Sequence, residues 1–97
     1  MFSKNSRYLT KGVQRALKLE VQIYLWSLID SLKEPKDYLQ VFNLKKLPDG
    51  WINVQHSQEE PEYYFETLIE LPLEEENLKV FVIDNGEYST MLLDYEY

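Results

Sequence analysis

The residues best suited to acid–base or metal chemistry lie in one short stretch around the only histidine of the chain. His56 is followed by carboxylates at Glu59, Glu60 and Glu62. An imidazole titrates near neutral pH, and together with carboxylates it can bind a metal or form an acid–base pair. Pro61 in the same stretch is typical of a strand exit followed by a solvated loop, and no second nitrogen ligand is present. These residues are weak metal candidates, and a structural or surface role is expected for His56.

Other catalytic machinery is excluded by residue type. The chain has no cysteine, so thiolate nucleophiles, thiolate metal sites and disulfides are ruled out. Any Ser/His/Asp arrangement would have to use His56, and nothing near the hydroxyl residues resembles a nucleophile elbow. Three glycines, scattered along the chain, do not form a phosphate-binding loop. We therefore assign no catalytic residue and expect no cofactor.

Charge is distributed unevenly along the chain. Residues 1–46 contain nine basic and four acidic residues, a balance of +5, whereas residues 47–97 contain one basic and thirteen acidic residues, a balance of -12. The basic start of the chain, which includes Lys11 and Arg15, could contact a partner. Nucleic acid is an unlikely partner, because a molecule with a net charge of -7 is repelled by a polyanion. Lys11 and Arg15 are therefore candidates for a protein interaction.

The elements that must position these residues begin with a helix predicted over residues 12–33. Val13, Leu17, Val21 and further apolar residues recur at steps of three and four, which makes one apolar stripe on a helix. Apolar residues outside the stripe, including Trp26, predict a helix that is wrapped by the domain or packed against another copy. Among the eight tyrosines and two tryptophans, Trp26 and Trp51 are the residues least expected to be buried, so both are interaction candidates.

Strand patterns follow the helix. Residues 38–44 and 51–56 flank a Pro-Asp-Gly turn and predict a hairpin, residues 62–71 alternate as a half-buried strand, and residues 78–83 are apolar on both faces. An Asp-Asn-Gly turn then leads to a last strand at about residues 88–95, and residues 6–9 could form a short initial strand. We predict an α+β fold with one long N-terminal helix packed on a mainly antiparallel sheet of four to five strands.

Chain length and hydropathy limit the number of domains and the presence of membrane-spanning segments. The 97 residues are enough for one domain, residues 1–97, and too few for a second core. No segment approaches the roughly 20 apolar residues that span a bilayer, and the basic start is not followed by the apolar core of a signal peptide. A cytoplasmic location without membrane contact is expected.

Several segments resemble a known family of short acidic proteins from Gram-positive bacteria and their phages, the domain of unknown function family 960. The resemblance rests on RYLTKGV (7–13), LWSLID (25–30), DYLQVF (37–42), HSQEEPEY (56–63), VFVID (80–84) and STMLL (89–93). It extends over nearly the whole chain. It implies a bacterial, cytoplasmic setting, with an association with mobile elements, and it transfers no activity, cofactor or site residue to any position.

Three functions remain open from the sequence. The leading hypothesis is a non-enzymatic protein–protein interaction or regulatory module, which self-associates or binds another protein through the apolar side of the helix or a sheet edge. The second is an acidic inhibitor that imitates nucleic acid and occupies a basic site on a host or phage protein. The third is a small metal-dependent enzyme centred on His56.

Overall fold

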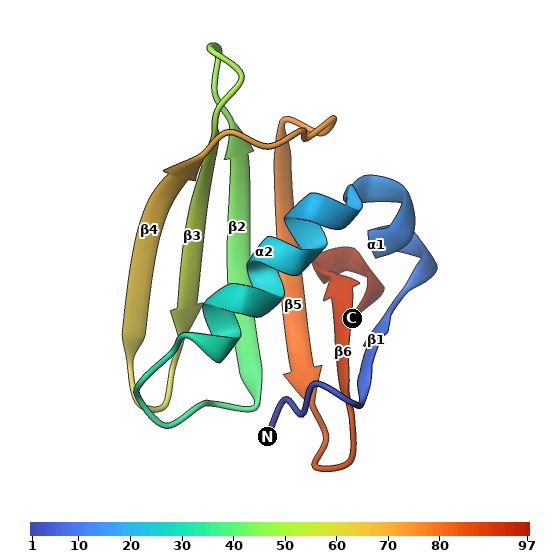
Figure 1. Cartoon of the computed structure of the whole chain (residues 1–97), viewed down its shortest axis with the longest axis vertical. Helices are drawn as coiled ribbons and strands as arrows, with labels where there is room; N and C mark the ends of the chain where they lie inside the picture. The colour runs from blue at the N-terminus through green and yellow to red at the C-terminus, as the bar shows by residue number, and fades with distance from the viewer.

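The computed structural model describes residues 1–97 and contains one six-stranded sheet with its longest helix across one face (Figure 1). The strands are β1 (Arg7–Leu9), β2 (Leu39–Lys46), β3 (Ile52–Gln58), β4 (Tyr63–Ile69), β5 (Asn77–Asp84) and β6 (Ser89–Leu93). The helices are α1 (Lys11–Ala16), α2 (Leu19–Asp30) and the 3₁₀ turn η1 (Asp94–Glu96). The strand order is β1-β6-β5-β2-β3-β4, which places β1 and β4 at the two edges.

The α+β class and a mainly antiparallel sheet are confirmed, but the predicted strand number and the predicted single long helix are wrong. The sheet has six strands and is mixed, because β1 runs parallel to β6 while every other neighbouring pair is antiparallel. A strand of three residues carries too little pattern to show its pairing or its direction, which only the path of the chain decides. The single long helix is also absent, since α2 has 12 residues and is the only α-helix longer than two turns.

The predicted helix is interrupted at Leu17 and Lys18, which are both extended, with φ/ψ of -117/129° and -66/155°. The apolar stripe could not reveal the break, because Leu17 is buried like the stripe residues before and after it. The interruption lets α1 contact β6 while α2 crosses the sheet. It leaves the Leu17 carbonyl outside the helical ladder, and the buried Gln22 side chain donates a hydrogen bond to that carbonyl at 2.9 Å.

We expect Gln22→Ala to lower the free energy of unfolding by about 1–2 kcal/mol, because the Leu17 carbonyl would lose its partner at a buried position. Urea denaturation measures the change. Gln14→Ala on the exposed side of α1 is the matched control and should alter stability by less than about 0.5 kcal/mol. Equal effects of the two substitutions would contradict a specific role for Gln22 at the helix break.

The two predicted hairpins are present. β2 pairs with β3 across the turn that contains Gly50, and β5 pairs with β6 across the turn that contains Gly86. Both glycines have positive φ, 89° and 97°, a conformation that side chains disfavour. Each turn sets the register of its own hairpin, and the long-range pairing of β2 with β5 joins the hairpins, so that Phe42, His56 and Val80 lie side by side on one face of the sheet.

The core lies between α2 and that face of the sheet. Figure 1 shows α2 running diagonally across the sheet in front of β2 and β5. Val21, Leu25 and Ile29 of α2 are fully buried against residues of the central strands, which include Phe42 and Val80. On the opposite face only the short turn η1 lies beside β5, and the ring of Tyr97, the residue after it, meets the Phe81 ring edge-on at 5.6 Å between centroids. Neither α1 nor α2 is long and apolar enough to cross a membrane.

Candidate functional site

His56 lies in the core, with no exposed surface. Its ring stacks on Phe42 at 4.4 Å between centroids and meets the edge of Tyr63 at 5.4 Å. Nε2 is 2.6 Å from the Gln40 side-chain oxygen, and Nδ1 has no partner. Burial lowers the pKa of His56 from 6.5 to about 4, so the ring is neutral near pH 7. His56 borders no surface hollow, which leaves it unable to meet a substrate.

The carboxylates that follow His56 in the sequence are not brought to it. Glu59, Glu60 and Glu62 are exposed in and beside the β3–β4 connection, and no group of three or more metal-binding side chains is present in the structure. The backbone N–H groups of Glu59 and Glu60 donate to the Asp37 carboxylate at 3.3 and 3.0 Å. These contacts hold the loop, and the geometry gives no support to a metal-dependent enzyme centred on His56.

A network of glutamines connects His56 to two loops at one end of the sheet. The Gln58 side-chain oxygen accepts from Gln40 Nε2 at 2.6 Å and from the Asp37 N–H at 3.0 Å. The Gln58 amide nitrogen donates to the carbonyls of Pro35 and Pro61, each at 2.9 Å. The network fixes the α2–β2 and β3–β4 connections relative to each other, and buried His56 contacts it through Gln40.

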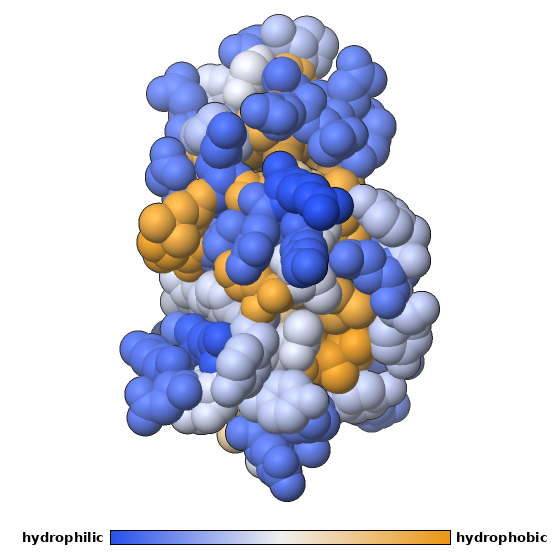
Figure 2. All heavy atoms as spheres, turned by 90° about the vertical axis from the view of Figure 1, so that its right-hand side faces the viewer, coloured by the Kyte–Doolittle hydropathy of each residue, from blue (hydrophilic) through white to orange (hydrophobic).

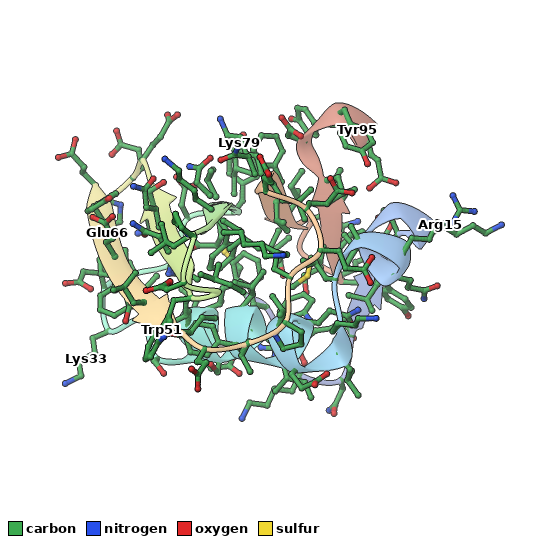
Figure 3. The ribbon with its side chains drawn as sticks, turned by 90° about the horizontal axis from the view of Figure 1, so that it is seen from above. Arg15, Lys33, Trp51, Glu66, Lys79 and Tyr95 are labelled. Carbon is green, nitrogen blue, oxygen red and sulfur yellow. The ribbon has the colours of Figure 1, made fainter.

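The four predicted interaction candidates lie apart. Lys11 and Arg15 are exposed on α1, where they border a shallow hollow with Glu75 and Glu96. Trp51 is 37% exposed beside the β2–β3 turn. Figure 3 shows Arg15 and Trp51 at different ends of the molecule. The structure therefore does not combine these residues into one surface.

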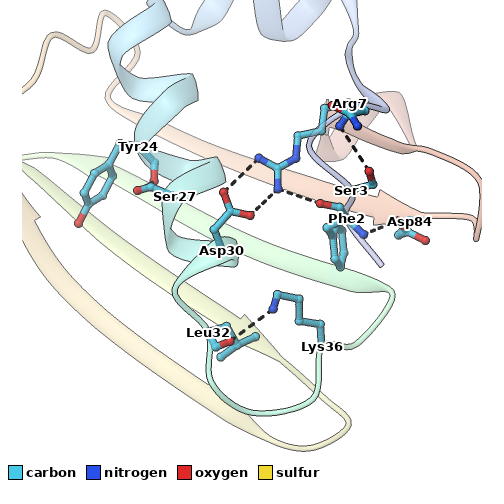
Figure 4. A network of polar contacts seen from close by, with 10 residues as sticks. Phe2, Ser3, Arg7, Tyr24, Ser27, Asp30, Leu32, Lys36 and Asp84 are labelled. Atoms are coloured by element: carbon cyan, nitrogen blue, oxygen red, sulfur yellow. Dashed lines mark hydrogen bonds and ion pairs between the residues drawn. The ribbon is translucent and has the colours of Figure 1, made fainter.

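Trp26, the fourth candidate, is half-buried on α2 under the guanidinium of Arg7, which lies 4.6 Å from the centre of the indole ring. Arg7 also forms an ion pair with Asp30 and donates to the Phe2 carbonyl at 2.8 Å (Figure 4). The Phe2 N–H donates in turn to the buried Asp84 carboxylate at 2.7 Å. Arg7 thus ties the start of the chain to α2, a role that sequence reasoning missed because the partner Asp30 lies 23 residues away.

Figure 2 shows the side of the molecule that carries α1 and β1. Apolar and hydrophilic side chains alternate there, without one continuous apolar area. The Glu96 carboxylate lies on this side and accepts from the Leu93 N–H at 2.8 Å and from the Thr10 hydroxyl at 2.7 Å, which lower the pKa of Glu96. These contacts join η1 to the start of α1, so this side is held together by local hydrogen bonds.

The face of the sheet that points away from α2 is covered only beside β5, by η1 and Tyr97, and we call it the uncovered face. Figure 3 shows Glu66, Lys79 and Tyr95 on this side, opposite α2. The register of the strands assigns its side chains, which are Leu39, Val41, Asn43 and Lys45 of β2, Asn53, Gln55 and Ser57 of β3, Tyr64, Glu66 and Leu68 of β4, Lys79, Phe81 and Ile83 of β5, Thr90 and Leu92 of β6, and Tyr8 of β1. The uncovered face therefore mixes aromatic, amide and charged groups.

Glu66 is the centre of a hydrogen-bonded group on the uncovered face. Its carboxylate accepts from Asn53 Nδ2 at 2.9 Å, from Gln55 Nε2 at 3.3 Å and from the Tyr64 hydroxyl at 3.0 Å. These donors, led by Asn53, lower the pKa of Glu66. The contacts orient polar side chains of β3 and β4 while the strands remain exposed.

A hollow of about 450 Å³ lies on the uncovered face next to this group. Neither Lys45 nor Lys79 in its wall forms an ion pair, and the Asn53 side-chain oxygen has no hydrogen-bond partner. The wall is formed by Asn43, Leu44, Lys45, Asn53, Gln55, Asn77, Leu78, Lys79, Asp94 and Tyr95. Amide and ammonium groups of this kind bind polar groups of a partner by hydrogen bonds.

Comparison with solved structures finds a similar chain from Enterococcus faecalis, described as a crystal structure of a protein of unknown function. It is 28% identical to the present chain, with a TM-score of 0.87, and the match covers 99% of this chain and 94% of that one. No curated protein matches. A family model described as Staphylococcal protein of unknown function (DUF960) matches residues 6–96, nearly the whole fold from β1 to η1. The chain therefore belongs to the DUF960 family, as its sequence motifs suggested.

Proposed function

We propose that the protein is a non-catalytic module that binds another protein through the uncovered face of its sheet. One observation carries the proposal, which is that large apolar and aromatic side chains stay exposed on strands at both ends of this face. Tyr64 and Leu68 of β4 are 58% and 52% exposed, and Tyr8 of β1 is 57% exposed. Tyr88, which packs edge-on against Tyr8, is 44% exposed.

The chemistry of the uncovered face supports a protein partner. Aromatic side chains are enriched at protein interfaces, because they give a large contact area and Tyr also carries a polar hydroxyl. The amides between the aromatic groups, among them Asn43 and Gln55, can pair with backbone groups of a partner. By comparison, the exposed large apolar residues of α2 are only Leu19 and Ile23, which lie one turn apart and form a small patch. The sheet therefore offers a larger binding surface than the helix.

Site-specific photo-crosslinking in staphylococcal cells tests the proposal. A benzoylphenylalanine in place of Tyr64 or Tyr88 should give a discrete adduct with another protein after irradiation. The same group in place of Ile23 on α2, which is also 58% exposed, is the matched control and should give none. The absence of a protein adduct at both sheet positions, or an equal adduct at Ile23, would overturn the proposal. An adduct only with a second copy of this chain would replace it with self-association.

A further inference from the structure

β4 is an edge strand whose outer side could pair with another strand. β4 pairs with β3 over seven consecutive residue pairs in one constant register, and no strand lies on its other side. Backbone N–H and C=O groups of alternate residues therefore point outward without a strand partner. The opposite edge of the sheet, β1, has only three residues. β4 is the long edge of this sheet.

Edge strands usually carry features that prevent pairing with other chains, such as lysine, proline or a bulge. The segment Tyr63–Ile69 contains no lysine, arginine, proline or glycine, and its constant register with β3 leaves no room for a bulge. Apolar side chains are exposed on both of its faces, with Leu68 on the uncovered face and Phe65, 39% exposed, on the helix face. The strand therefore combines free backbone groups with apolar side chains that an added strand would cover.

The stretch of chain along this edge carries only negative charge. Residues 59–70, which comprise the β3–β4 connection, β4 and the residue after it, contain five glutamates and no lysine, arginine or histidine. Glu74, Glu75 and Glu76 lie away from this edge, beside Lys18 and basic residues of α1 and β2. None of the five carboxylates at the edge forms an ion pair. They favour a cationic occupant of the edge, by charge complementarity.

The same charge disfavours a second copy of β4 as the occupant. Antiparallel pairing of two copies centred on Glu66 would place the two Glu66 side chains opposite each other and Glu62 opposite Glu70. Like charges directly opposite each other destabilise a pair of strands. A partner of opposite charge avoids this repulsion in every register.

We propose that β4 binds an extended basic segment of a partner protein, which adds to the sheet as a seventh strand. Outward backbone groups of β4 pair with the backbone of the segment, and apolar side chains of the segment cover Leu68 and Phe65. Lysine or arginine side chains of the segment lie near the glutamates of residues 59–70. The inference rests on the proposed function, because it names one part of the binding surface and the chemistry of the partner.

The test uses the full-length protein and three synthetic peptides of nine residues, followed by fluorescence anisotropy. One peptide alternates lysine and valine, the second alternates glutamate and valine, and the third is the lysine peptide with its central amides N-methylated. We expect only the unmethylated lysine peptide to bind. Its affinity should fall at least tenfold at 0.5 M salt, and its binding should slow amide hydrogen exchange in β4. Equal binding of the glutamate peptide or the methylated peptide would overturn strand addition.

Two substitutions separate docking at the edge from general attraction of opposite charges. Leu68→Lys on β4 and Leu19→Lys on α2 add the same charge at similarly exposed apolar positions, 52% and 64%. We expect Leu68→Lys to weaken the lysine peptide at least tenfold and Leu19→Lys to change its affinity less than twofold. Equal losses would overturn the inference. A wild-type dimer in sedimentation that Leu68→Lys dissociates would also overturn it, and would identify a second copy as the occupant.

Failure of this inference can be distinguished from failure of the proposed function. Crosslinks from Tyr88 report binding at the far end of the uncovered face, on the side of β6 rather than β4. If the lysine peptide does not bind but the Tyr88 adduct remains, the uncovered face binds a protein and the edge does not take a basic strand. If the adducts at Tyr64 and Tyr88 are both absent, the proposed function itself fails.

Discussion

Phe2→Ala is expected to lower the free energy of unfolding by about 3 kcal/mol or more, the usual cost of removing a fully packed phenylalanine ring. The Phe2 side chain is 3% exposed and belongs to the same core as α2 and the central strands. Its backbone N–H donates to the buried Asp84 carboxylate, which also accepts from the Gly86 N–H at 2.7 Å. Loss of the ring would therefore leave a cavity in the core next to the β5–β6 turn.

Urea denaturation followed by tryptophan fluorescence measures this change. Tyr95→Ala is the aromatic control, because Tyr95 is 76% exposed and should contribute less than about 0.5 kcal/mol. Asp84→Asn keeps the Phe2 ring and removes one of the carboxylate oxygens that accept hydrogen bonds. Its effect on stability therefore measures the contribution of the Asp84 contacts separately from that of the ring. A loss of similar size for Phe2→Ala and Tyr95→Ala would show that residue 2 is not part of the core.

The stability of the protein should fall as the pH is lowered from about 6.5 to 4, because the pKa of His56 is 6.5 in its ordinary state and about 4 in the folded protein. The unfolded chain binds a proton in this range and the folded chain does not, so the free energy of unfolding decreases with decreasing pH. Above pH 6.5, His56 is neutral in both states and its contribution to the free energy of unfolding is fully present. Its loss amounts to up to about 3 kcal/mol at pH 4, at roughly 1.4 kcal/mol per pH unit.

Urea denaturation between pH 5 and pH 7 isolates this effect. The carboxylates with a lowered pKa, Glu66 and Glu96, are ionised in both states over most of this range and lose their stabilisation only at lower pH. His56→Gln removes the titrating group and keeps an N–H donor for Gln40. The variant should be less stable than the wild type at pH 7 but should lose the slope between pH 5 and pH 7. An unchanged slope would contradict the assignment of the pH dependence to His56.

Much of the sheet could be predicted from the sequence, because its signals are local. Alternation of apolar residues and the turns at Gly50 and Gly86 indicated both hairpins, and the alternation placed Ile52, Val54 and His56 on one face. The helix break at Leu17 could not be predicted in this way. A buried apolar residue satisfies the helical stripe whether its backbone is helical or extended, and only the packing of α1 against β6 decides between them.

The candidate site was less predictable than the fold. Neighbouring carboxylates made His56 a metal candidate, but alternation along β3 turns its side chain into the core, while Glu59 and Glu60 lie beyond the end of the strand. The exposed edge at β4 has no sequence signal, because the pattern of a strand does not show whether it has one neighbour or two. The position of β4 in the strand order made it an edge.

The sequence by itself determined the residue types, the uneven charge, the two tight turns and the faces of the central strands, because these properties depend on neighbours in the chain. Only the tertiary structure decided which charges meet. The positive and negative halves of the chain share one ion pair between exposed groups, Lys18 with Glu74, while Arg7 pairs with Asp30 inside the positive half. Ion pairs form between groups that the fold brings within about 4 Å, and such proximity depends on strand order and helix direction. The five glutamates of residues 59–70 therefore remain without an ion pair along the edge of the sheet.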